Sequence, residues 1–99
     1  MQEQVKAPAS FVQLVNDIDT ALDNVVDTGS DDALFIASYL QGHFAVQARK
    51  LELEAEASAQ LLNERMQTSL SAAFKNKELE GDDQTAVLAL WQQLLAPFQ

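Results

Sequence analysis

The sequence contains no cysteine, one histidine and few basic residues. Without cysteine the chain can form no disulfide, use no thiolate nucleophile and bind no zinc through sulfur. Six lysines and arginines stand against 15 aspartates and glutamates, and the formal net charge is -9. No basic residue occurs between Lys6 and Arg49. Because proteins hold nucleic acids and anionic lipids mainly through lysine and arginine, we expect neither a nucleic acid nor a membrane as partner.

Long apolar runs are also missing. No stretch approaches the roughly 20 apolar residues that cross a bilayer, and the first residues, MQEQVKAPASF, do not have the pattern of a signal peptide. We therefore expect a cytoplasmic protein. Its 99 residues suffice for one domain with a hydrophobic core. We expect that domain over residues 10–99, after a disordered or frayed segment over residues 1–9.

Glycine and proline are rare, with three and two copies. Apolar residues that recur at steps of three and four predict one helix over about residues 10–27 and a second over about residues 30–51. Ser10 with Gln13 fits a capping box at the start of the first helix. Gly29 stands where the first helix should end, because helices commonly end in glycine.

The second half of the chain has weaker boundaries. No glycine or proline occurs between Gly42 and Gly81, and we place a turn near residues 52–56, where LELEAE interrupts the apolar stripe. Without this turn, a single helix would run over residues 30–74 and would be about 65 Å long, which is too long for a compact domain of this size. We therefore expect a separate third helix after the turn. A fourth helix should begin at Asp82 as its cap and close at Pro97. These four amphipathic helices predict an all-α fold, an antiparallel up-and-down four-helix bundle.

The second helix has an unusually wide apolar face. One stripe should face the core, and a second group lies beside it: Phe35, Tyr39, Gly42 and Val46. Together the two groups cover more than half of the circumference, more than a helix exposed on one side needs. This helix is therefore expected to contact neighbours on two sides, or to contact another molecule.

Gly42 and His43 interrupt that face, and each has two interpretations. Gly42 costs about 1 kcal/mol relative to alanine in a helix, which suggests a close backbone approach, either inside the fold or to another molecule. His43 is either a neutral ring bonded to a neighbour, or a general base or metal ligand. The chain has no second histidine, and nothing in the local sequence is available for a base to activate. We therefore favour the structural role for His43.

Acidic residues form two further candidates. Asp19, Asp23 and Asp27 stand four residues apart on the first helix, where their mutual repulsion opposes helix formation. This acidic ladder is either a solvated face or a docking face for a basic protein. The stretch DTGSDD at 27–32 has acid spacing that could attract calcium, but it lacks a complete EF-hand loop. A helix boundary capped by Ser30 accounts for the same residues.

The second helix also resembles a known family. DDALF at 31–35 and YLQGH at 39–43, followed by DDQ at 82–84 and a tryptophan at 91, are similar to the YfcL-like family of small bacterial proteins, whose function is unassigned. The likeness covers roughly residues 11–95, and YLQGH is its most specific part. The resemblance implies a small all-helical protein and brings no catalytic residues to this chain.

The sequence has no phosphate-binding loop, nucleophile motif or nucleotide fingerprint. We therefore expect no enzyme and no cofactor or metal, but a protein–protein interaction module that acts as adaptor or regulator. Its partner is an unidentified protein or a second copy of the chain. The alternatives are a homodimeric structural protein, and a small-ligand-binding or enzymatic bundle centred on His43 and Tyr39. The expected interaction surface comprises Tyr39, Gly42, His43, Val46, Asp19, Asp23 and Asp27.

Overall fold

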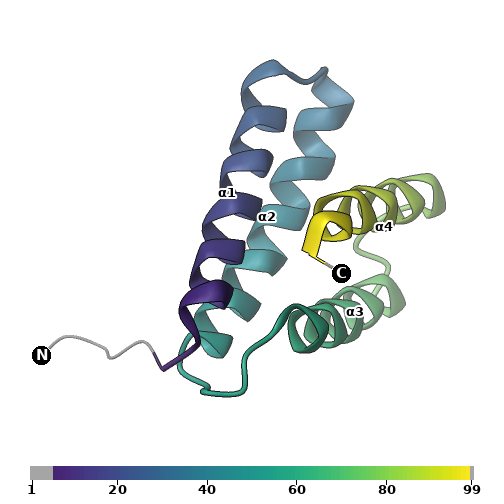
Figure 1. Cartoon of the computed structure of the whole chain (residues 1–99). Coiled ribbons are helices and arrows are strands. Elements are labelled where there is room, and N and C mark those ends of the chain that lie inside the picture. The colour runs from purple at the N-terminus through teal and green to yellow at the C-terminus, as the bar shows by residue number, and fades with distance from the viewer. Residues whose placement is uncertain (1–5, 99) are drawn as a thin grey trace, which may run out of the picture.

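The computed structural model describes residues 6–98. These residues form four α-helices and one short 3₁₀ helix, and no strand occurs among them (Figure 1). The elements are α1 (Ala9–Thr28), α2 (Asp31–Leu51), α3 (Ala59–Lys75), α4 (Gly81–Leu95) and the 3₁₀ helix η1 (Ala96–Phe98). The all-α class predicted from the sequence is confirmed.

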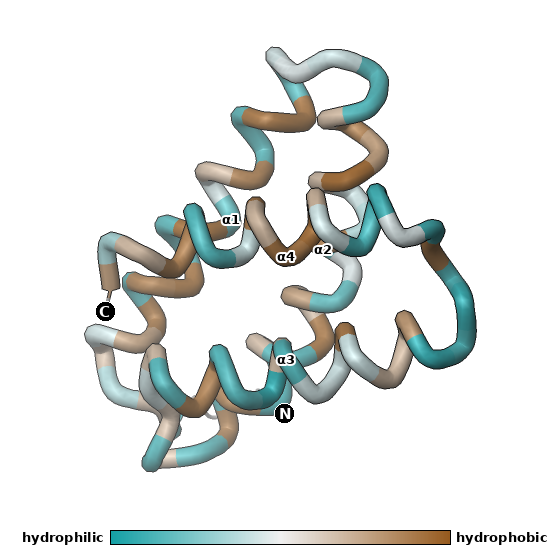
Figure 2. Tube along the Cα trace, turned by 90° about the vertical axis from the view of Figure 1, so that its right-hand side faces the viewer, coloured by the Kyte–Doolittle hydropathy of each residue, from teal (hydrophilic) through white to brown (hydrophobic). Residues whose placement is uncertain are grey.

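The four helices are arranged as two antiparallel hairpins. In Figure 1, α1 and α2 run side by side, and the α3–α4 pair lies across them. Figure 2, turned by 90°, shows α3 and α4 crossing in front of the first hairpin. The up-and-down arrangement predicted from the sequence is not confirmed. Residues 52–58, between α2 and α3, allow the chain to turn away from the axis of α2.

The hydrophobic core lies where the hairpins cross, and α2, like α4, contacts all three other helices. The fully buried ring of Trp91 on α4 lies 6.0 Å, between ring centroids, from the ring of Phe44 on α2. Its indole N–H donates a hydrogen bond of 2.8 Å to Oδ1 of Asn63 on α3. Within residues 6–98, every buried side-chain nitrogen or oxygen has a hydrogen-bond partner.

The junction between α1 and α2 follows the sequence signals. The Ser30 hydroxyl caps α2 by accepting a hydrogen bond of 3.2 Å from the Ala33 backbone N–H, and α2 ends at Leu51, where the turn was predicted to begin. Gly29 has an ordinary φ of -79°, so the left-handed conformation does not explain it. A Cβ at Gly29 would lie 2.6 Å from the Val25 carbonyl oxygen and 2.9 Å from the Ala33 Cβ. Close approach of the chain is the reason for this glycine.

Two predicted helix caps are wrong. The Ser10–Gln13 capping box does not form, because α1 begins earlier, with Pro8 at the N-cap position and no side-chain cap; the fixed φ of proline suits a helix start. Asp82 lies inside the first turn of α4, whose N-cap residue is Glu80. There the Asp82 carboxylate still favours the positive end of the helix dipole.

The chain ahead of α1 is attached to the end of α2. The backbone N–H groups of Lys6 and Ala7 donate to the Glu52 carbonyl at 2.8 and 3.1 Å. These bonds tie down the last part of the segment that was predicted to fray. Residues 1–5 of that predicted segment, and residue 99, lie outside the described residues.

Candidate functional site

The side of α2 that faces away from the core carries exposed apolar residues. Phe35 and Val46 expose 50% and 51% of their surface, Tyr39 is partly exposed between them, and Gly42 is exposed. Their steps of four, three and four residues place them on one line along the helix, as in a helix-packing seam. We call Phe35, Tyr39, Gly42 and Val46 the outer face of α2. The second apolar group predicted from the sequence is thus largely uncovered at Phe35 and Val46, while Tyr39 also packs against the core.

A shallow, open groove runs along this face. It has a volume of about 450 Å³ and is lined by Tyr39, Gly42, His43 and Val46 together with Ser69 of α3. The structure therefore brings together four of the seven residues expected at the interaction surface. Sequence reasoning missed Ser69, because only the packing of α3 against α2 places it there. The need of His43 for a hydrogen-bond partner was the one signal that pointed to such a residue.

Tyr39 is held in place by the loop between α3 and α4. Its hydroxyl donates a hydrogen bond of 2.9 Å to Oε1 of Glu78. Burial, the hydrogen bond to Glu78 and the charge of Glu78 raise the pKa of Tyr39 to about 12. The bond ties the Tyr39 side chain to the α3–α4 loop.

His43 lies at the same edge, against α3. Its Nδ1 is 2.8 Å from Ser69 Oγ, and its ring centroid is 4.8 Å from that of Tyr39, with the ring planes at 45°. The side chain is partly buried. One ring nitrogen is thus engaged by a neighbour, which is the arrangement expected of a structural histidine.

The contact between Ser69 and His43 also has to be considered as a nucleophile and its base. Such a pair needs a third group that orients the imidazole, and N–H donors for the developing oxyanion. Within residues 6–98, no carboxylate is hydrogen-bonded to the His43 ring. Ser69 lies inside α3, where backbone N–H groups are used by the helix itself. The pair therefore lacks the surroundings that acyl transfer requires.

Among residues 6–98, Gly42 does not serve a close contact with another part of the chain. Apart from its chain neighbours and the nearby backbone of α2, a Cβ built at this position meets none of their atoms within 4 Å. The structure therefore contradicts the interpretation in which Gly42 permits an internal helix crossing. The other interpretation, contact with another molecule, stays a prediction.

The acidic ladder is separate from the groove. Asp19, Asp23 and Asp27 belong to α1, and the Asp23 carboxylate accepts a hydrogen bond of 3.0 Å from the Gln41 side chain of α2. At about 100° per residue, His43 lies about 70° from the middle of the outer face, and Gln41 lies about 130° from it on the other side. Burial, followed by repulsion from Asp23, raises the pKa of Asp19. The structure does not bring the ladder together with the other predicted surface residues.

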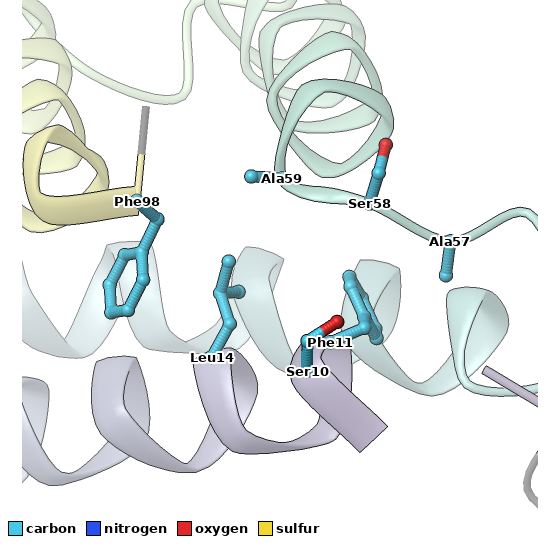
Figure 3. Close-up of a pocket in the computed structure, with 7 residues that line it drawn as sticks. All are labelled: Ser10, Phe11, Leu14, Ala57, Ser58, Ala59 and Phe98. Atoms are coloured by element: carbon cyan, nitrogen blue, oxygen red, sulfur yellow. The ribbon is translucent and has the colours of Figure 1, made fainter. Parts of the chain in front are cut away.

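A second apolar pocket lies between α1, the α2–α3 linker and the chain end (Figure 3). Phe11, Leu14 and Phe98 line it, and its volume is about 270 Å³. Its polar side chains are those of Ser10 and Ser58, and the Ser58 hydroxyl already caps α3 through the Leu61 N–H at 3.1 Å. Among residues 6–98, no ionisable side chain lines this pocket.

Among residues 6–98, no group of three or more histidine, aspartate or glutamate side chains is placed to hold a metal ion. No helix in that part of the chain is long and apolar enough to cross a bilayer.

Comparison with known proteins identifies the family. The family model described as YfcL protein matches residues 12–96. The chain belongs to the YfcL family. A member from Escherichia coli (strain K12), named Uncharacterized protein YfcL, is 37% identical over 73 residues, which are 74% of this chain and 79% of that protein. No solved structure matches the chain. The YfcL match includes all of α2 and therefore the whole outer face.

Proposed function

We propose that this YfcL family member is a non-catalytic interaction module, and that the outer face of α2 receives an α-helix of a partner protein. The observation that carries the proposal is Gly42, a glycine inside a helix with open space where its side chain would stand. Such a glycine lowers helix stability by about 1 kcal/mol relative to alanine. A partner backbone that approaches α2 at this point gives the glycine a use.

The residues around Gly42 fit a helix better than an extended peptide. The apolar residues of the outer face follow the four-three-four spacing of a seam between two helices. Ser38 and Ala45 are exposed beside Gly42, and small residues allow the backbones of two helices to come close. An amphipathic partner helix laid along this seam would cover Phe35 and Val46, which make little contact with the core.

Site-specific photo-crosslinking tests the proposal. The photoreactive residue p-benzoylphenylalanine replaces Val46 on the outer face, or Thr85 on the exposed side of α4 as a matched control, in the cells that naturally make the protein. We expect an adduct from position 46 that maps to an α-helix of the partner. The adduct should be absent from position 85 and lost when Gly42→Leu is added. Equal labelling from both positions, or no adduct from position 46, would contradict the proposal.

A further inference from the structure

The two ends of α2 carry opposite charges. Asp31 and Asp32 are exposed in its first turn, and Arg49 and Lys50 are exposed in its last turn. Within residues 6–98, the side chains that form an ion pair at 4.0 Å or less are Arg65 and Glu54. The four charged side chains at the ends of α2 therefore have no ion-pair partner among these residues. Each suits the dipole of its own helix. Together they make α2 acidic at one end and basic at the other.

We propose that the helix seated on the outer face is α2 of a second copy of this chain, packed antiparallel. The proposal rests on the proposed function and names the partner helix. Take the two-fold axis level with the midpoint between residues 40 and 41. Phe35 then lies opposite Val46 of the second copy, and Tyr39 lies opposite Gly42 of the second copy. The Tyr39 side chain, whose hydroxyl stays bonded to Glu78, then comes level with the open space at Gly42 of the second copy, where a small residue leaves room for its ring.

The same register pairs the charges. Asp31 and Arg49 are about five helical turns apart and lie on one flank of the outer face, while Asp32 and Lys50 lie on the other flank. In an antiparallel two-fold pair, each flank meets the same flank of the second copy. Asp31 therefore comes level with Arg49 of the second copy, and Asp32 with Lys50 of the second copy, to within one residue. Both flanks are complementary at once.

A parallel pair lacks this complementarity, because it would set the acidic ends against each other. Each copy also carries a net charge of -9, which opposes self-association in any arrangement that does not match local charges. In the antiparallel register, apolar residues of the two copies lie opposite each other, Tyr39 lies opposite a glycine, and opposite charges meet on both flanks.

The fold leaves room for this partner. Gln41, which is hydrogen-bonded to α1, lies about 130° around α2 from the middle of the outer face, and His43, which contacts α3, lies about 70° from it on the other side. These attachments of α1 and α3 leave open space at Gly42. A second α2 can approach along the outer face.

Charge-reversed variants of the full chain test the proposal. One variant carries Asp31→Lys with Asp32→Lys, and the other carries Arg49→Glu with Lys50→Glu. Light scattering after size exclusion gives the mass of each, of wild type and of an equimolar mixture, and circular dichroism checks that each is helical. We expect wild type to have the mass of a dimer, twice 10.9 kDa. Each variant alone should have a dimer dissociation constant at least tenfold higher, and the equimolar mixture should form a dimer again.

A further variant protects the test against misfolding at the helix ends. Gly42→Leu places a side chain in open space within one chain and against Tyr39 of the second copy. We expect this variant to stay folded and to lose the dimer. Wild type that is monomeric at several hundred micromolar, a dimer that Gly42→Leu leaves intact, or a mixture that stays monomeric would overturn the proposal. If the protein is a monomer but still crosslinks from position 46 to a helix of another protein, the proposal of a second copy as partner is wrong and the proposed function is retained.

Discussion

At the residue scale, the ionisation of the Tyr39 phenol can be measured without interference from another tyrosine. It is the only tyrosine in the chain, so the ultraviolet absorbance of its phenolate during a pH titration reports its own ionisation. We expect a midpoint near 12 in the folded protein. Glu78→Gln removes the neighbouring charge, and the midpoint should then fall toward the ordinary value of 10.0. The same midpoint in both proteins would contradict the hydrogen bond between Tyr39 and Glu78.

The sign of the linked stability follows from the direction of that shift. The pKa of Tyr39 is higher in the folded chain than in the unfolded chain, so folding favours the protonated phenol. The stabilisation by the Glu78 contact is complete below pH 10 and is lost as the pH rises through about 12. Thermal unfolding of wild type and Tyr39→Phe should therefore converge over that range. A constant difference in melting temperature would contradict the contact.

At the element scale, substitutions at two glycines compare the structural requirement at Gly29 with the functional role that we propose for Gly42. Gly42→Ala adds a methyl group in open space and should raise the free energy of unfolding by about 0.5–1 kcal/mol. Gly29→Ala forces its Cβ against the Val25 carbonyl and should lower that free energy by more than about 1 kcal/mol. Urea unfolding at low protein concentration measures both. A destabilised Gly42→Ala would show that Gly42 serves the fold after all.

The same scale shows what the sequence can predict. Ser30 and Leu51 were placed correctly, because a cap or a change in periodicity is a local property of the chain. The Ser10 cap was wrong because Pro8 provides a competing start for the same helix. The role of Gly42 was not decidable from sequence, since a glycine in a helix signals a close neighbour without saying which chain supplies it. The contact of His43 with Ser69 depends on tertiary packing and could not be read locally.

At the scale of the whole molecule, the crossing of two hairpins explains why α2 packs into the core on one side and remains exposed to solvent on the other. The inward side of α2 contacts α1, α3 and α4, while its outer face keeps Phe35 and Val46 half exposed. The sequence predicted the four helices but not their crossing, because amphipathic stripes fix which side of each helix is buried and leave the angle between helices open. Because exposed apolar patches often mark interaction sites, these side chains on one line of α2 support our proposal that the outer face receives another helix.

In-cell hydroxyl-radical footprinting tests most directly whether that surface is covered. Oxidation of Phe35 on the outer face is compared between dilute purified protein and the protein inside cells, with Phe98 at the far pocket as internal control. We expect the oxidation rate of Phe35, taken relative to that of Phe98, to be several-fold lower in cells than in the dilute purified protein. Equal oxidation of Phe35 in both settings would show that the outer face of α2 is free in the cell and would contradict the central claim.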